Sequence, residues 1–90
     1  MYLHLGQATV VTYDDILGIF DLDTTTVSKT TRDYLARSEK AGEVENVSFD
    51  LPKSFIVCRD YRGEREKIVY ISPISSATLL KRINNLKIIN

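Results

Sequence analysis

Apolar and polar residues alternate over short stretches in the first part of the chain, a pattern typical of β-strands with one buried face. Residues 2–5 alternate in this way, and residues 9–12 form a second predicted strand after a turn at 6–7. Residues 16–20 are instead an unbroken apolar run of strand length, which predicts a strand buried on both faces. Gly18 inside this run predicts a bulge or a close neighbour there.

The spacing of apolar residues changes to that of a helix after a polar loop at 21–26. The less polar positions form a narrow stripe on one helical face: Val27, Thr31, Tyr34, Leu35, Ser38 and Ala41. Ser28 suits the N-cap of this helix, and Gly42 suits the position just beyond its end. The sequence therefore predicts a helix over residues 28–41.

The second half of the chain contains the strongest strand signals. Residues 44–49 predict a short strand. Residues 54–59 and 67–72 are rich in Val, Ile and aromatic residues, and a turn around Arg62 and Gly63 between them completes a hairpin.

A second helix is predicted after Pro73, which ends the last strand, and either Ser75 or Ser76 would cap it. Its apolar positions return at helical spacing: Leu79, Leu80, Ile83 and Leu86. The chain contains no internal repeat and no linker. These elements predict a single α+β domain over residues 1–90, with a small, mostly antiparallel sheet and two helices.

Small size favours self-association of this chain. Ninety residues bury only a modest core, and the single cysteine excludes an internal disulfide. Leu86, Ile88 and Ile89 are surplus apolar residues near the C-terminus, where such residues fray unless they dock. They either pack on their own sheet or dock onto a neighbouring subunit, and the second alternative predicts a homo-oligomer.

Candidate catalytic residues are few. Cys58 lies in a predicted strand, where a free cysteine usually serves as a small buried hydrophobe, and His4 is the only histidine that could activate it. The serines at 72–76 lack a nucleophile-elbow motif, and the four glycines are too isolated to cradle a phosphate. The acidic residues at 14–15 and 21–23 suit turns and caps better than a cation site. We therefore expect no enzyme, cofactor, metal site or small-molecule substrate, with a small cysteine hydrolase as a remote alternative.

The lack of recognisable targeting signals in the sequence leads to an expectation about location. The first residues lack a basic start and a sustained apolar run, and no apolar stretch approaches the ~20 residues of a membrane helix. A lone thiol fits a reducing compartment. We expect a cytoplasmic protein with no membrane partner.

Charge is distributed unevenly along the chain, although the net charge is zero. Residues 1–51 hold four basic and nine acidic side chains, whereas residues 52–90 hold eight basic and three acidic ones. This asymmetry indicates either an acidic or nucleic-acid partner or simply a dipolar, solvated surface. The candidate DNA-binding residues are basic side chains around the hairpin and on the second helix: Lys53, Arg59, Arg62, Arg65, Lys67, Lys81 and Arg82. Alternatively, Glu64 and Glu66 neutralise the hairpin, and its charges serve only solubility.

Four segments of the chain resemble, in order, segments of one bacterial family. They are 1–6 (MYLHLG), 17–21 (LGIFD), 51–57 (LPKSFIV) and 70–82 (YISPISSATLLKR). The chain thereby resembles the Rem family of extracellular-matrix (biofilm) regulators, and in particular its RemB-like branch, which is related to the RemA-like branch. The resemblance extends over nearly the whole chain.

This resemblance implies a DNA-associated regulator that works as an oligomer. RemA-like members are DNA-binding activators of matrix genes that form rings, around whose outside DNA is expected to wrap. Their subunits resemble LytTR-type DNA-binding domains. The resemblance therefore implies a LytTR-like subunit, with duplex DNA and further copies of the chain as partners.

One segment departs from the RemA-like pattern. RemA-like members carry adjacent arginines in the loop before the central strand, where this chain has Asp50, Leu51, Pro52 and Lys53. Lys53 alone keeps a positive charge, and Asp50 repels phosphate. Two functions are therefore compared: a ring-shaped, DNA-binding transcriptional regulator that recognises DNA mainly by bending or shape, and an oligomeric protein-interaction module that has lost direct DNA binding.

Overall fold

The computed structural model describes residues 1–22 and 27–88, and the side chains of the C-terminal helix as far as Asn85. Its elements, in chain order, are β1 (Tyr2–Gly6), β2 (Thr9–Thr12), a 3₁₀ turn (Tyr13–Asp15), β3 (Ile16–Asp21), α1 (Lys29–Lys40), β4 (Val44–Asn46), β5 (Ser54–Cys58), β6 (Ile68–Ser72) and α2 (Ser76–Ile88). The α+β class expected from the sequence is confirmed.

The strands form two sheets rather than one. β1 and β2 pair as an antiparallel hairpin, and the remaining described strands form a sheet in the order β3-β5-β6-β4. β5 pairs antiparallel with both β3 and β6, whereas β4 joins β6 in parallel. The prediction of mostly antiparallel pairing is therefore confirmed, and the division into two sheets is an addition to it.

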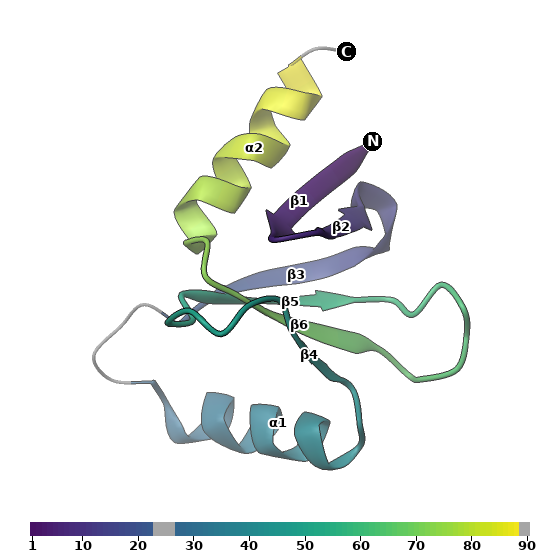
Figure 1. Ribbon diagram of the computed structural model, residues 1–90, viewed down its shortest axis with the longest axis vertical. Coiled ribbons are helices and arrows are strands. Elements are labelled where there is room, and N and C mark those ends of the chain that lie inside the picture. The colour runs from purple at the N-terminus through teal and green to yellow at the C-terminus, as the bar shows by residue number, and fades with distance from the viewer. Residues whose placement is uncertain (23–26, 89–90) are drawn as a thin grey trace.

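The four-stranded sheet lies between two layers, as Figure 1 shows. α1 covers one face, and α2 with the β1–β2 hairpin covers the other. Successive side chains of a strand point to opposite faces of its sheet. Along β5, Phe55 and Val57 accordingly belong to the core cluster under α1, and Ile56 and Cys58 belong to the cluster under α2 and the hairpin.

β3 is an edge strand, so the prediction that residues 16–20 are buried on both faces was wrong. Leu17 is 66% exposed and Phe20 is 47% exposed, while all five residues of β5 are buried. Periodicity cannot distinguish a central strand from an edge strand because it does not report which strands are neighbours. The prediction for Gly18 is confirmed, since the register shifts between Ile16 and Gly18 and an added Cβ would lie 2.7 Å from the Phe20 ring.

Local capping signals identified the helix ends correctly. The Ser28 hydroxyl accepts a hydrogen bond from the Thr31 amide at 3.1 Å, as an N-cap does. Gly42 follows the end of α1 with a φ of 72°, a conformation that glycine adopts without strain. At α2, the Ser75 hydroxyl accepts a hydrogen bond from the Thr78 amide at 3.2 Å, so the cap is Ser75 rather than Ser76.

The remaining predictions concern the end of β4, the loop before α1 and the C-terminal tail. β4 ends at Asn46 rather than at residue 49. The Val47 amide still donates to the Ile71 carbonyl of β6 at 2.9 Å, but Phe49 is fully exposed and lies beyond the pairing with β6. Most of the predicted loop at 21–26 lies outside the described residues, as do the side chains of Leu86, Ile88 and Ile89. The docking of that tail and the LytTR-like subunit stay predictions.

Candidate nucleic-acid interface

A buried carboxylate shapes the loop between β5 and β6, where most of the candidate basic residues lie. Asp60 is only 5% exposed and accepts hydrogen bonds from the amides of Arg62 and Arg65 at 3.1 and 3.0 Å. Burial alone would raise the pKa of Asp60, but these amides and the Arg65 side chain lower it below its ordinary value. The loop is therefore folded around an ionised carboxylate.

Arg65 and Lys67 hold this loop against the β4 side of the sheet. The Arg65 guanidinium lies 3.5 Å from Asp60 and 3.3 Å from Glu45. Burial alone would lower the pKa of Arg65, but hydrogen bonds to Glu45 and Asp60 raise it. The Lys67 ammonium lies 2.7 Å from the buried carboxylate of Glu43, and this hydrogen bond raises the pKa of Lys67. Carboxylates thus neutralise both cations, and most of the surface of each side chain is buried.

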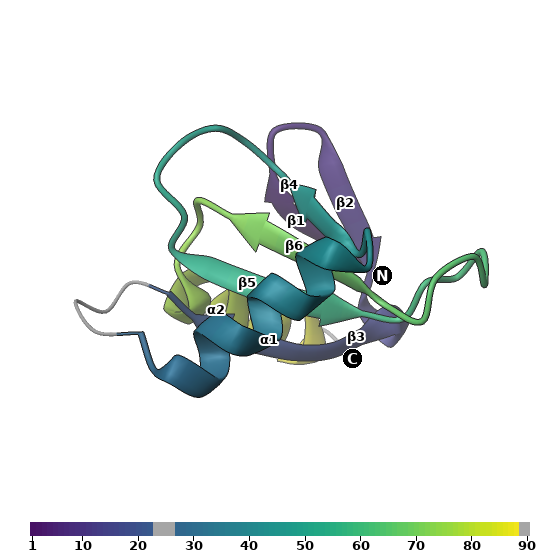
Figure 2. The ribbon, with the colours of Figure 1, turned by 90° about the horizontal axis from the view of Figure 1, so that it is seen from below.

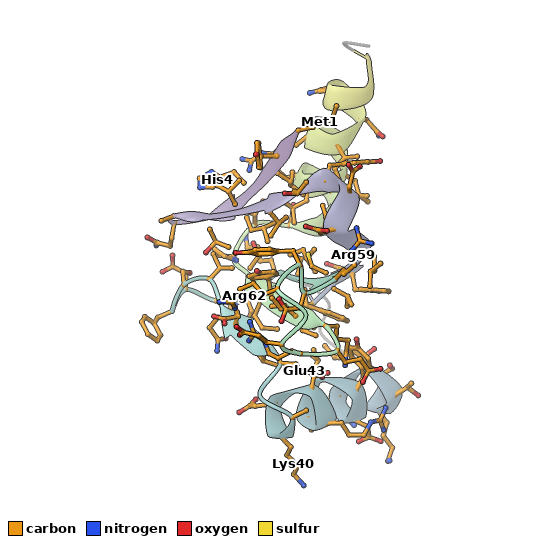
Figure 3. The ribbon with its side chains drawn as sticks, turned by 90° about the vertical axis from the view of Figure 1, so that its right-hand side faces the viewer. Met1, His4, Lys40, Glu43, Arg59 and Arg62 are labelled. Carbon is orange, nitrogen blue, oxygen red and sulfur yellow. The ribbon has the colours of Figure 1, made fainter. Side chains whose placement is uncertain are left out.

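The remaining two hairpin arginines are more accessible. Arg59 is exposed, and its guanidinium donates to one oxygen of Asp15 from Nε and Nη2, at 3.2 and 3.1 Å. Arg62 is half-exposed and lies 3.8 Å from Asp60 and 4.0 Å from Glu64, which are weak contacts. Figure 3 looks onto this hairpin and shows Arg59 and Arg62 at separate places on it.

Lys53 lies immediately before β5, at the other end of that strand. Its amide donates to the Ser72 carbonyl at 2.8 Å, and its own carbonyl accepts from the Leu22 amide at 2.9 Å. Its backbone is thereby held between the ends of β6 and β3. Its side chain is exposed, and the ammonium has no ion-pair or hydrogen-bond partner among the described residues.

The last two candidates belong to α2. Arg82 is exposed and donates from one guanidinium nitrogen to the His4 carbonyl at 3.1 Å, which ties α2 to β1. Lys81 is exposed and has no partner of this kind in the described part of the chain.

The seven predicted residues therefore lie at three places rather than on one surface. Four surround the β5–β6 loop, Lys53 lies roughly 20 Å away at the far end of β5, and two lie on α2 beside β1. Figure 1 shows this separation, with the β5–β6 loop projecting to the right and α2 rising above the sheet. A single subunit offers only a few free cations in each region.

The carboxylates that pair with these cations are mostly not the ones that the sequence suggested. Glu64 reaches only Arg62, at 4.0 Å, and the closer partners are Asp15, Glu43, Glu45 and Asp60. A signal for Asp60 was available, because an aspartate that opens a turn after a strand often accepts turn amides. No such local signal exists for the others, which come from distant parts of the chain.

The cysteine-hydrolase alternative finds no support in the geometry. Cys58 is buried in the core, and burial, together with the charge of Asp15, raises the pKa of its thiol to about 12. A thiol in this state is protonated at neutral pH and is a poor nucleophile. The exposed His4 ring donates instead to the Gln7 carbonyl at 2.6 Å.

The serines near α2 have structural roles. The buried Ser72 hydroxyl donates to the Leu5 carbonyl at 2.6 Å, and Ser54 donates to the Ile74 carbonyl at 2.7 Å.

Among the described residues, no group of three or more His, Cys, Asp or Glu side chains is placed to hold a metal ion. Neither α1 nor α2 combines the length and apolar character that a membrane-crossing helix requires.

Comparison with known proteins identifies the family. No family model matches the chain. Over 82 residues, the chain is 38% identical to extracellular matrix regulatory protein B of Bacillus subtilis (strain 168), and the match covers 91% of this chain and 89% of the relative. The chain belongs to the Rem family, in its RemB-like branch. The Rem-family resemblance inferred from four sequence segments is therefore confirmed, and the name of the relative supports a role as a regulator.

Proposed function

We propose that this chain is a cytoplasmic, non-enzymatic transcriptional regulator of extracellular-matrix genes that binds duplex DNA as a ring-shaped homo-oligomer. The observation that carries the DNA-binding role is the placement of Lys53. Its backbone is held on both sides by β3 and β6, while its ammonium is exposed and free of partners among the described residues. A cation held in this way is ready to contact a phosphate with little loss of backbone freedom.

The other free or weakly paired cations add to this contact. Arg62, Lys81 and Arg82 are exposed or half-exposed. Arg59 forms a surface ion pair with Asp15, and such a pair contributes little to stability, so Arg59 could give it up to contact a phosphate. One subunit would then make only a few phosphate contacts and would bind weakly. Several subunits in one ring would repeat these contacts along the duplex and raise the affinity by avidity.

A second candidate function is an oligomeric protein-interaction module without direct DNA binding. The neutralisation of Arg65 and Lys67 by buried carboxylates favours it, because these cations would have to break their pairs to reach a phosphate. Asp50 also lies three residues from Lys53 and repels phosphate.

Fluorescence anisotropy of a labelled duplex at ~50 and ~200 mM salt distinguishes the two functions. DNA binding by an oligomer should weaken by roughly a thousandfold or more over this range, as expected for six to ten phosphate contacts. Lys53→Ala and Arg62→Ala should each weaken binding at low salt, whereas Lys40→Ala at the far end of α1 should not. If no binding is measured even at low salt, the direct DNA role is wrong and the second function takes its place.

A further inference from the structure

β3 leaves an apolar groove at one edge of the sheet. The groove has a volume of about 360 Å³ and lies between β3 and α1. Leu17 and Phe20 of β3 form one wall, Tyr34 of α1 forms the other, and Phe55 and Val57 of β5 form the floor. Leu17 and Phe20 remain largely exposed, so the described part of the chain does not cover this edge. A groove of this size can accommodate one aromatic side chain with an aliphatic neighbour.

The loop 47–53 between β4 and β5 carries apolar side chains on its outside. Phe49 is fully exposed and Leu51 is 77% exposed, which is unusual for two large apolar residues so close in the sequence. The loop itself is held at both ends. The Val47 amide donates to the Ile71 carbonyl, and the Lys53 amide donates to the carbonyl of Ser72, the next residue of β6.

Loop 47–53 begins at one edge of the four-stranded sheet and crosses the end of the sheet to β5, whereas the groove lies along β3 at the other edge. β4, which leads into the loop, is one edge of the four-stranded sheet, and β3 is the other. Figure 2 shows the loop arching along the top of the view and β3 along the bottom, and Figure 3 shows the same separation from the side. The loop of one copy therefore cannot fill its own groove, but it can reach the groove of a second copy.

Charge also favours this contact between copies. Asp50 lies beside Phe49, and Lys53, at the end of the loop, is the other charged residue of loop 47–53. The groove is closed at one end by Thr30 and Thr31 from the first turn of α1, a turn that contains no acidic side chain. A carboxylate is stabilised near the N-terminus of a helix. Over its whole length, α1 holds four basic and two acidic side chains, so its surface attracts the Asp50 carboxylate.

We propose that Phe49 and Leu51 of one copy dock into the groove between β3 and α1 of a second copy. This inference rests on the self-association in the proposed function and identifies the two surfaces that produce it. Because the two surfaces are different and separate, each contact leaves one loop and one groove open for the next subunit. Such head-to-tail contacts close into a ring or continue as a filament, according to the angle between subunits.

The experiment measures the mass of the full chain and of two variants by light scattering after size-exclusion chromatography. Phe49→Asp removes the apolar tip and keeps the groove, whereas Leu17→Asp alters the groove and keeps the tip. Both positions are exposed, so both variants should fold, which thermal unfolding checks; Leu17→Asn replaces Leu17→Asp if the latter does not unfold cooperatively. Tyr61→Asp is the matched control, because Tyr61 is a comparably exposed aromatic residue on the β5–β6 loop.

We expect the wild-type chain and Tyr61→Asp to assemble, and each of the other variants to associate at least about 30-fold more weakly, as the loss of a central aromatic contact does. An equimolar mixture of Phe49→Asp and Leu17→Asp should form a dimer and nothing larger, since one intact tip and one intact groove remain. Absence of this dimer, or assembly of either variant as in the wild type, would overturn the proposed interface.

The oligomer and the interface proposed for it can be contradicted separately. If the wild-type chain is large but Phe49→Asp is equally large, the interface is wrong and the oligomer stands. If the wild-type chain is a monomer at ~100 μM, a concentration well above the dissociation constants of specific assemblies, both the oligomer and the interface are wrong. DNA binding is measured separately, by the anisotropy titration, so its outcome is read independently of the mass measurement.

Discussion

At the scale of single residues, the carboxylate of Asp60 has the largest influence on the candidate interface. It accepts hydrogen bonds from two loop amides and lies 3.5 Å from the Arg65 guanidinium, all within the loop that connects β5 to β6. These interactions favour the ionised form and lower its pKa against the opposing effect of burial. The loop that presents Arg59 and Arg62 thus depends on a charge of the opposite sign.

Asp60→Asn should lower the free energy of unfolding at pH 7, because the amide cannot replace the charge-assisted hydrogen bonds. A lowered folded-state pKa contributes stability that is complete above the ordinary value of 3.8 and is lost as the pH falls through the folded-state value. The difference in the free energy of unfolding between Asp60→Asn and the wild type should therefore shrink below pH 3.8. Urea unfolding between pH 2.5 and 7 measures this difference, with Asp50→Asn on the exposed loop as the control. A pH-independent difference would contradict this account.

At the scale of elements, one ion pair joins the end of α1 to the start of β6. Glu43 follows α1 and is buried, and its carboxylate binds Lys67, which precedes β6. The Lys67 ammonium also lies 5.3 Å from the centre of the Tyr34 ring on α1. The backbone continues the same connection, since the Val69 amide donates to the Glu43 carbonyl at 2.8 Å. A residue that the sequence suggested for DNA contact thus also connects the helix to the sheet.

Lys67→Met should destabilise the fold by about 2 kcal/mol, because it leaves the Glu43 carboxylate buried without its cation. Lys29→Met is the matched control: the Lys29–Asp33 pair is exposed, and its loss should cost less than about 0.5 kcal/mol. Chemical denaturation at pH 7 measures both changes. The Lys67 contribution should persist below pH 10.5 and decline as the pH rises through the raised folded-state pKa. Equal effects of the two substitutions would show that the buried pair has no special role.

At the scale of the whole molecule, the basic residues are too dispersed for one subunit to form a compact DNA-binding surface. They lie on the β5–β6 loop, before β5 and on α2, and several are neutralised within the subunit. A duplex would therefore have to contact several subunits to reach useful affinity. This argument connects the proposed DNA binding directly to the proposed assembly.

A monomeric Phe49→Asp variant should accordingly bind a labelled duplex at least about a hundredfold more weakly than the wild type at ~50 mM salt, the smallest gain typical of multivalent binding. Ala36→Asp is the control, because it adds the same charge at an exposed position of α1 that does not line the groove and is distant in sequence from the basic residues of the proposed interface. Fluorescence anisotropy gives both affinities. If the monomeric variant binds as tightly as the wild type, DNA binding does not depend on assembly.

Local features of this fold could be predicted from the sequence. The Ser28 cap, the Gly42 end signal and the β5–β6 hairpin were all identified, because each depends on residues within one or two turns of the chain. The bulge at Gly18 was identified for the same reason. Four short segments in register were also sufficient to recognise the family, which the comparison with a curated relative then confirmed.

The relations between elements were determined only by the tertiary structure. The unbroken apolar run of β3 suggested a central strand, but packing places β5 there and leaves β3 at an edge with an open groove. Three cations of the hairpin, Arg59, Arg65 and Lys67, meet carboxylates from far along the chain, as Arg59 meets Asp15 from 44 residues away. Sequence patterns report which face of an element is apolar, whereas the partner of that face, or of a charge, depends on which distant segments pack together.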